Sequence, residues 1–179
     1  MSERFCELIK ERQSCRAFLN KPVDEKLIYD IIADALNAPS ACNSQPWRVF
    51  VTNTECENEK MKNCLQDDGK NMFLDGAKAF VAIYETESVK LNAGTESKFS
   101  SDRFVEYDIG EFIAYMTLSA KDRGLGSCII GWVNNDKINA TFNLKGKCKI
   151  VVALGYEKDG TPRKKIRLGL KEIVLNYKG

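Results

Sequence analysis

The spacing of apolar residues near the N-terminus predicts two helices. Apolar side chains recur at helical spacing within residues 3–11, which indicates a short first helix. A second helix is predicted to begin near Pro22 and Asp24 and to end at the sequence APS, residues 38–40. Its apolar residues share one face, as expected of a helix that covers a core: Leu27, Ile28, Ile31, Ile32, Ala35 and Leu36.

The pattern then changes to short apolar runs, which indicate strands. These runs cover residues 47–53, 79–84 and 149–156, and the second is apolar throughout, as in a fully buried strand. Residues 55–66, between the first two runs, are charged and only weakly helical in pattern. The predicted fold class is therefore α+β, with helices layered around a modest sheet.

One further helix, from about Tyr107 to Arg123, is unusually apolar. Apolar residues cover most of its circumference, while the polar residues fall on one narrow stripe formed by Asp108, Glu111, Ser119 and Asp122. Such a helix must be surrounded by protein, either as the central helix of the core or as part of a dimer interface. The polar stretch between Tyr84 and Tyr107 is predicted to be a surface excursion or a lid.

Composition and charge exclude several classes of partner. The chain has 179 residues without repeat or linker, so we expect one domain spanning residues 1–179. Its net charge of +2 supplies no broad field for nucleic acid or for a membrane surface. The N-terminus lacks the apolar run of a signal peptide, and no stretch is apolar enough to span a membrane. Seven scattered cysteines favour reduced thiols, so we expect a cytoplasmic protein.

The absence of histidine restricts the possible chemistry more than any other feature of the composition. It removes Ser–His and Cys–His nucleophile pairs, histidine-ligated zinc or iron, and the commonest general base. We therefore expect no metal site and no catalytic side chain. If the chain is an enzyme, a bound cofactor carries the reaction.

The sequence RQSCRAF near the N-terminus places two arginines and a serine at every second position. In an extended segment Arg12, Ser14 and Arg16 would project from one side, while Gln13 and Cys15 face the other way. Two guanidinium groups and a hydroxyl on one side are typical of a site for a phosphate dianion.

A second basic cluster lies near the C-terminus, in the sequence RKKIR. Lys165 and Arg167 repeat the period of two there. The alternative for both basic clusters is that their residues are simply solvated, since exposed arginine and basic tails are common.

The sequence APSACNSQPW, residues 38–47, gathers polar groups in a short turn between a predicted helix and a predicted strand. Such residues can simply form the turn that connects a helix to a strand, or they can belong to a binding site. The second interpretation is favoured by two stiffening prolines and by four polar residues crowded between them: Pro39, Ser40, Asn43, Ser44, Gln45 and Pro46.

The sequence GLGSCIIGWV, residues 124–133, matches neither classical nucleotide loop. Its glycines do not form G-x-G-x-x-G, and it lacks the lysine and hydroxyl residue of a P-loop. Two interpretations stay open. Gly124 can cap the preceding helix before a buried strand, or the glycines can let backbone N–H groups approach a flat ligand.

Taken together, these blocks resemble the FMN-dependent nitroreductase family and occur in that family's order. The blocks are RQSCRAF, APSACNSQPW, the helix start YDIGEF, GLGSCIIGW, ALGY and the late KIR, which together run from Arg12 to Arg167. The resemblance implies an α+β fold with a mainly antiparallel central sheet flanked by helices. It also implies a homodimer, with the long apolar helix at the interface and two FMN sites shared between the subunits.

The resemblance assigns three groups of residues to FMN. The phosphate and ribityl contacts would come from Arg12, Gln13, Ser14, Arg16, Lys165 and Arg167. The segment that reaches the flavin from the partner subunit would comprise Pro39, Ser40, Asn43 and Gln45. The loop whose backbone faces the N5 and O4 edge of the flavin would be Ile129, Ile130 and Gly131. The family usually has an asparagine and a lysine before the second strand. Here Lys70 or Asn71 could correspond to them, but the sequence does not fix the alignment.

The activity implied by the resemblance is NAD(P)H-dependent reduction of nitroaromatic, quinone or similar small acceptors. NADH or NADPH would transfer hydride to N5 of the flavin and leave before the acceptor takes the electrons, in a ping-pong cycle. One alternative is a flavin-binding storage or sensor module without useful turnover. Another is a specialised flavin enzyme of the same fold, such as a reductive dehalogenase.

Overall fold

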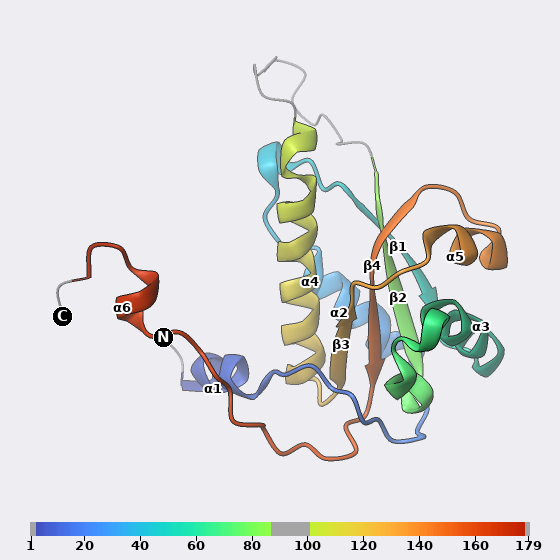
Figure 1. Ribbon diagram of the computed structural model, residues 1–179, viewed down its shortest axis with the longest axis horizontal. Coiled ribbons are helices and arrows are strands. Elements are labelled where there is room, and N and C mark those ends of the chain that lie inside the picture. The colour runs from blue at the N-terminus through green and yellow to red at the C-terminus, as the bar shows by residue number, and fades with distance from the viewer. Residues whose placement is uncertain (1–2, 87–100, 178–179) are drawn as a thin grey trace.

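The structure contains a four-stranded antiparallel sheet with helices on both faces (Figure 1). This computed structural model describes residues 3–86 and 101–177. The sheet has the order β1-β2-β4-β3, formed by β1 (Trp47–Thr52), β2 (Ala79–Glu85), β3 (Gly126–Ile130) and β4 (Lys147–Gly155). The helices are α1 (Glu3–Glu11), α2 (Glu25–Ala35), α3 (Glu55–Leu65), α4 (Val105–Asp122), α5 (Asn135–Phe142) and α6 (Leu170–Ile173). Short 3₁₀ turns are η1 (Ala41–Asn43), η2 (Asp67–Gly69), η3 (Met72–Gly76) and η4 (Ser101–Phe104).

The predicted fold class is confirmed, and the predicted strands correspond to β1, β2 and β4. The long helix is present but begins at Val105, two positions earlier than predicted. The strand interpretation of the glycine-containing loop is also confirmed, because Gly124 has a positive φ of 79° after α4 and β3 follows it. The predicted lid falls largely on 87–100, outside the described residues. Among the described helices none combines the length and the apolar character that crossing a membrane requires.

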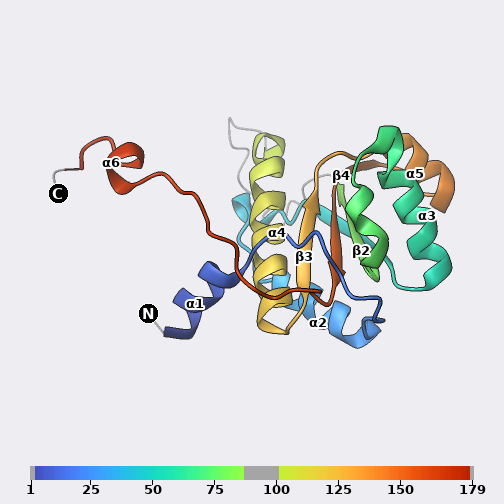
Figure 2. The same cartoon turned by 60° about the horizontal axis from the view of Figure 1, so that its bottom comes forward.

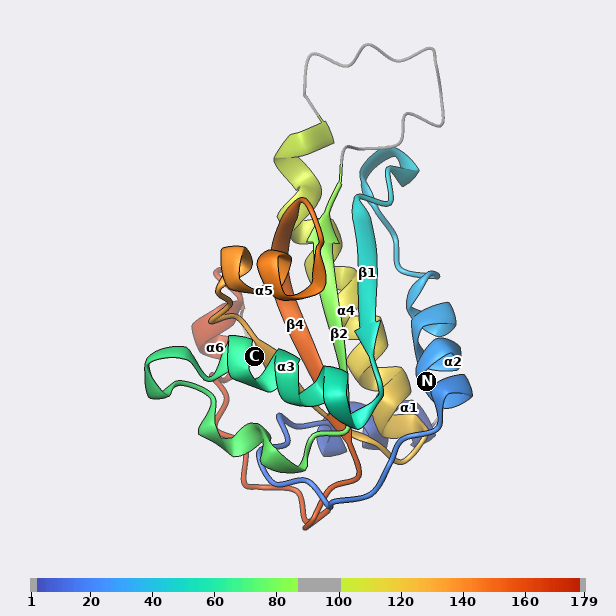
Figure 3. The same cartoon turned by 90° about the vertical axis from the view of Figure 1, so that its right-hand side faces the viewer.

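The core lies on both faces of the two central strands. Val81 of β2 pairs with Val152 of β4, and both point into a core shared with α2 and α4. Their neighbours Phe80 and Ala153 point the other way, into a core shared with α3 and α5. Figures 2 and 3 show the sheet between these two helical layers. Burial on both faces explains why the sequence of β2 is apolar throughout.

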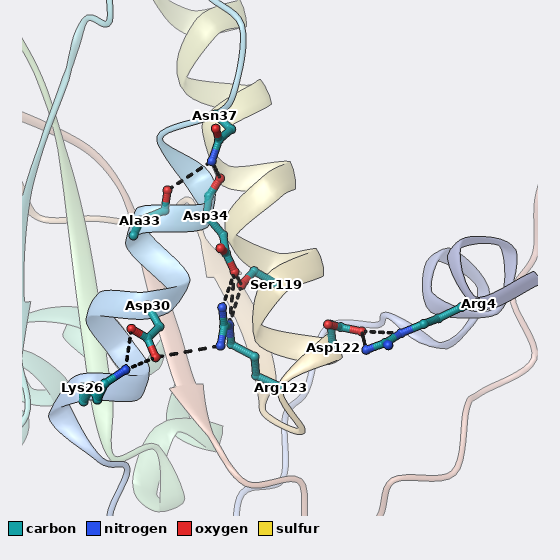
Figure 4. A network of polar contacts seen from close by, with 9 residues as sticks. All are labelled: Arg4, Lys26, Asp30, Ala33, Asp34, Asn37, Ser119, Asp122 and Arg123. Atoms are coloured by element: carbon teal, nitrogen blue, oxygen red, sulfur yellow. Dashed lines mark hydrogen bonds and ion pairs between the residues drawn. The ribbon is translucent and has the colours of Figure 1, made fainter. Parts of the chain in front are cut away.

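A polar network on the outer side of one layer joins α2 to α4 (Figure 4). Asp34 of α2 accepts hydrogen bonds from the Ser119 hydroxyl at 2.6 Å and from Arg123 Nη2 at 2.8 Å. Both hydrogen bonds favour the charged carboxylate and lower the pKa of Asp34, and the bond from Ser119 has the larger effect. Arg4 of α1 donates to Asp122 of α4 at 2.7 Å. Exposed contacts of this kind orient the helices but contribute little stability.

The segment after α1 extends the sheet beyond β3. Ser14 forms a parallel bridge with Ser127, and the Cys15 N–H donates to the Ser127 carbonyl at 2.8 Å. Phe18 then pairs with Glu157, which follows β4. The two ends of the chain therefore run along the same edge of the sheet, and this edge positions the residues considered next.

Phe112 of α4 tests the packing of this core. It is fully buried and stacks on Trp47 with ring centroids 4.8 Å apart. Replacing Phe112 with alanine should lower the free energy of unfolding by about 3–5 kcal/mol, because it removes an aromatic ring and leaves a cavity. Chemical denaturation followed by circular dichroism measures this loss. Glu111→Ala, an exposed position on the same helix, is the control and should cost less than about 0.5 kcal/mol. Equal losses in the two variants would contradict this packing.

Candidate functional site

The two basic clusters of the sequence meet at one pocket. Arg12 and Lys165 are 153 positions apart, yet both line a cavity of about 360 Å³ at the edge of the sheet. We call this cavity the basic pocket; it is lined by Arg12, Gln13, Ser14, Arg163, Lys164, Lys165, Ile166 and Arg167. These lining residues include five cations and no carboxylate. Such unbalanced positive charge suits a small, highly charged anion.

Lys165 holds the C-terminal segment against the end of α1. Its ammonium group donates to the carbonyls of Ile9 at 3.3 Å, of Lys10, and of Arg12 at 2.7 Å. Carbonyls at a helix C-terminus carry partial negative charge and lack helical partners, so a lysine is favourable there. Desolvation, followed by the nearby charges of Arg12 and Arg167, lowers the pKa of Lys165. An anion in the pocket would relieve this repulsion.

The guanidinium groups of Arg12 and Arg167 keep donors for a ligand. Arg167 donates through Nη1 to the Ile166 carbonyl at 2.8 Å. Neither arginine forms an ion pair with a carboxylate in the described part of the chain. The predicted convergence of Arg12, Ser14, Lys165 and Arg167 is therefore present in the structure.

The structure does not bring Arg16 into the basic pocket. Its guanidinium carbon lies 5.8 Å from the ring centroid of Phe73. Burial raises the pKa of the Cys128 thiol, and the charges of Arg16 and Arg163 both oppose that rise. The reason is the path of the chain, which pairs with β3 at Ser14 and has moved beyond β4 by Phe18. Side chains of this segment therefore do not keep a common direction.

The predicted flavin loop lies at the end of β3 and is open on one side. Ile130 is buried, whereas Ile129 and Gly131 are exposed. A Cβ atom added to Gly131 would meet no atom within 4 Å, so its backbone is accessible to a flat ligand. Beside it lies a second, apolar pocket, lined by Ile9, Arg12, Gly110, Ile113, Ala114, Thr117, Leu118, Ile129 and Ile150. Arg12 lines both pockets, so a charged site and an apolar surface adjoin each other.

Lys70 and Asn71 both lie near this loop. Lys70 Nζ is 5.2 Å from the ring centroid of Trp132, which directly follows Gly131. Asn71 has a left-handed backbone and donates its amide to the Leu65 carbonyl at 2.8 Å and to the Trp132 carbonyl at 3.4 Å. The Asn71 amide thus orders the turn before β2, while the Lys70 ammonium lies over the Trp132 ring.

The polar turn at 39–45 is built around the buried carboxylate of Asp108 at the start of α4. Asp108 and Ser44 are only 4% and 2% exposed. The carboxylate accepts hydrogen bonds from the Ala41 N–H at 3.1 Å and from the Ser44 hydroxyl at 3.2 Å. Its negative charge also lies at the positive end of the helix dipole. One side chain therefore links the turn to α4.

Three residues of this turn have an unusual backbone. Cys42, Asn43 and Gln45 have positive φ values of 54°, 53° and 45°. Residues other than glycine are uncommon in this region, and such conformations concentrate at functional sites. Gln45 is held further by Ser40, whose hydroxyl accepts from the Gln45 N–H at 3.1 Å.

Within one chain, the polar turn and the basic pocket lie apart. The turn contacts Asp108, whereas Arg12 shares the apolar pocket with Thr117 and Leu118. The apolar pocket extends along α4 from Gly110 to Leu118, but no residue of the turn lines it or the basic pocket. Figure 1 shows the turn at one end of α4 and the segment after α1 at the other. The predicted contributions of Pro39, Ser40, Asn43 and Gln45 are therefore not united with Arg12 in a single subunit.

Two residues that matter for the site were not among those predicted. Arg163 lines the basic pocket and donates from Nη2 to the Ser14 carbonyl at 2.8 Å. It shares the period of two with Lys165 and Arg167, which was a usable signal. Asp108 was assigned to a polar stripe, and nothing local to it indicated that a turn far away in the sequence would cover it.

Asp108 provides a test of the polar turn. Asp108→Ala should lower the free energy of unfolding by about 2–3 kcal/mol, because it leaves the Ala41 N–H and the Ser44 hydroxyl without their buried acceptor. Urea denaturation measures the change. Asp122→Ala on the same helix removes an exposed carboxylate paired with Arg4 and should cost under about 1 kcal/mol. A loss for Asp108→Ala as small as that of the control would contradict the anchoring role.

Comparison with known proteins places the chain in a family. A model of the nitroreductase family matches residues 9–68 and 57–156. Among curated proteins, a provisionally named NADH dehydrogenase/NAD(P)H nitroreductase of Archaeoglobus fulgidus is 26% identical over 163 residues, covering 88% of this chain and 87% of that protein. The nitrobenzene nitroreductase of Ectopseudomonas oleovorans is 43% identical over 49 residues, which are 27% of this chain and only 22% of that enzyme.

A solved structure has the same fold. The provisionally named nitroreductase of Exiguobacterium sibiricum, in complex with FMN, superimposes with a TM-score of 0.81 at 19% identity, covering 95% of each chain. At this identity the likeness shows a shared fold. Because the family model spans most of the sequence from residue 9 to residue 156, the chain belongs to the nitroreductase family.

Proposed function

We propose that this chain is an NAD(P)H-dependent FMN oxidoreductase that acts as a homodimer on small acceptors such as nitroaromatics or quinones. The observation that carries the proposal is the basic pocket, where Arg12 and Lys165 converge with three further cations and no lining carboxylate. Family membership supports FMN as the cofactor and NAD(P)H as the electron donor. In this proposal the whole chain serves as one FMN-binding domain, and its cytoplasmic location stays a prediction.

The residues at the edge of the sheet fit FMN. A phosphate dianion matches the free donors of Arg12 and Arg167 and the hydroxyl of Ser14. Lys165 adds positive charge, although its ammonium is directed at the end of α1. A flat ring system has an open backbone at Gly131 and an adjoining apolar pocket to contact.

When bound, FMN supplies the redox chemistry, because it can accept a hydride from NAD(P)H and pass electrons to an acceptor. The chain itself binds and orients. Arg12, Ser14 and Arg167 hold the phosphate end, and the backbone from Ile129 to Gly131 supports the ring. The apolar pocket keeps water from one side of the site. A side-chain proton shuttle is not required, in agreement with a chain that contains no histidine.

Two exposed apolar surfaces support the homodimer. The outer face of α4 exposes Tyr107, Gly110 and Ala114, and the two small residues would let a second helix approach closely. The C-terminal segment extends away from the body of the subunit (Figures 1 and 2). It exposes a continuous set of apolar side chains: Ile166, Leu168, Leu170, Ile173, Val174, Leu175 and Tyr177. A second copy of the chain would cover both surfaces.

A homodimer also accounts for the separation of the polar turn from the basic pocket. The turn residues Ser40, Asn43 and Gln45 line neither the basic pocket nor the apolar pocket of their own subunit. In the proposed dimer they complete the site of the other subunit. The ordering of the turn by Asp108 then prepares a binding surface for a neighbouring flavin.

The first experiment is a spectrum of the purified protein. We expect oxidised flavin absorbance, released flavin that is FMN, and bleaching by NADH or NADPH without oxygen. A nitroaromatic or quinone should then restore the oxidised spectrum. A flavin that neither nucleotide reduces would instead support the storage or sensor module. Protein that binds no FMN on reconstitution would contradict the proposal.

A mixed dimer tests the shared site. Arg12→Ala should weaken FMN binding about 10- to 100-fold, the loss expected for a charged hydrogen bond to phosphate. Asn43→Ala should also weaken retention, but through the partner. A dimer with one Arg12→Ala subunit and one Asn43→Ala subunit places both substitutions in one site and leaves the other intact. Titration should therefore show one site of normal affinity per mixed dimer, and absence of this recovery would contradict cross-subunit sharing.

A further inference from the structure

We propose that Gln13 and Arg163 are positioning residues, which hold the C-terminal cations in place for a phosphate without binding the phosphate themselves. This inference rests on the proposed function, because FMN is the ligand concerned. The resemblance to the family assigned Gln13 to the cofactor directly, and nothing in the sequence assigned a role to Arg163. The hydrogen bonds of the two side chains indicate that they position the C-terminal cations and do not contact the cofactor.

Both ends of the Gln13 amide are used by the C-terminal segment. Its Oε1 accepts from the Arg163 backbone N–H at 3.0 Å and from Arg163 Nε at 3.2 Å. Its Nε2 donates to the Thr161 carbonyl at 3.1 Å. Arg163 completes the link by donating from Nη2 to the Ser14 carbonyl at 2.8 Å. We call these four contacts the Gln13–Arg163 clasp.

The position of the clasp makes it the last firm attachment before the phosphate-binding cations. Glu157 is the last residue paired with the sheet edge, and Lys158 donates its N–H to the Ala17 carbonyl at 2.9 Å. The clasp follows at 161–163, and Lys165 and Arg167 come directly after it. Beyond them the chain leaves the body of the subunit (Figure 2).

The cations that the clasp positions repel one another. Lys165 and Arg167 lie with Arg12 around one pocket whose lining includes no carboxylate. Lys165 is itself attached to the carbonyls at the end of α1. Without the clasp, this attachment alone would hold the like-charged segment beside Arg12, and the rest of the segment would have to be reordered when phosphate binds. Because the clasp orders the segment during folding, phosphate binding loses less conformational entropy. The affinity therefore rises although the clasp does not touch the ligand.

Arg163 could instead act only through its charge, and neighbouring residues separate the two roles. Arg163→Lys keeps a positive charge but loses the forked donors that reach Gln13 and Ser14 together. Gln13→Leu keeps the size of the side chain and changes no charge. Lys158→Ala is the matched control, because it removes an exposed positive charge from the same segment, while its side chain is absent from the pocket lining and from the clasp contacts.

The test compares the affinities for FMN and for riboflavin, which lacks the phosphate. Gln13→Leu and Arg163→Lys should each weaken FMN binding about 5- to 20-fold, as expected for the loss of one or two hydrogen bonds. Riboflavin affinity should stay near that of the parent. The double variant should be little weaker than the weaker single variant, because both changes break one unit. Lys158→Ala should have a much smaller effect on FMN binding.

A second measurement can be made on the parent protein as well as on a variant. Trypsin cleaves after the basic residues at 163–167, so cutting there reports how firmly the segment is held. FMN should protect the segment in the parent protein, riboflavin should protect it poorly, and Gln13→Leu should accelerate cutting without flavin. This readout also keeps the inference testable if one variant does not fold.

Several results would overturn the inference. These are parent-like FMN affinity in Gln13→Leu, an equal loss of riboflavin and FMN affinity, an effect of Lys158→Ala as large as that of Arg163→Lys, or a segment at 163–167 that FMN does not protect from trypsin. Failure of the proposed function looks different, since the parent protein itself would then bind no FMN. Tight FMN binding that depends on Arg12 but not on Gln13 would leave the function intact and remove only the clasp.

Discussion

Burial of the β2–β4 pair on both faces is the constraint on which the rest of the structure depends. Two apolar faces require two helical layers, so α2 and α4 cover one side and α3 and α5 the other. With the faces covered, the edge of β3 keeps backbone groups that can pair with another segment. Ser14 and Cys15 pair there. The residues of the proposed anion site are thus positioned by a hydrophobic requirement that has no direct relation to chemistry.

The basic pocket is locally unfavourable, and its support comes from neutral groups. Like charges around one cavity repel, and no lining carboxylate offsets them. Instead, helix-end carbonyls hold Lys165, while Gln13 and the Ser14 carbonyl hold Arg163. Carbonyl partners fix the cations without neutralising them, whereas carboxylate partners would compete with the ligand. A site that breaks a local rule in this way is expected to serve function, with stability supplied by the core.

The sequence was sufficient to predict individual helices and strands, but it did not indicate which distant segments lie side by side. Local periodicity was sufficient for β2, which is buried on both faces, and for α4, whose apolar residues cover most of its circumference. The meeting of the two basic clusters came from a family resemblance, since no local pattern reports which distant segments pair. Arg16 shares the period of Arg12 but not its surroundings, because the chain passes from β3 to the end of β4 between Ser14 and Phe18. Alternate side chains point to the same side only while a segment stays extended and straight.

The C-terminal segment joins two tasks in one short stretch of chain. Lys165 and Arg167 face the basic pocket, and the apolar side chains that begin at Ile166 and continue to Tyr177 are exposed. If these side chains pack on a second copy, as proposed, the same backbone carries the phosphate contacts and the subunit contacts. Ordering it for either partner lowers the entropy cost of binding the other. Linkage is reciprocal, so cofactor binding must then strengthen the dimer by the factor by which dimer formation strengthens cofactor binding.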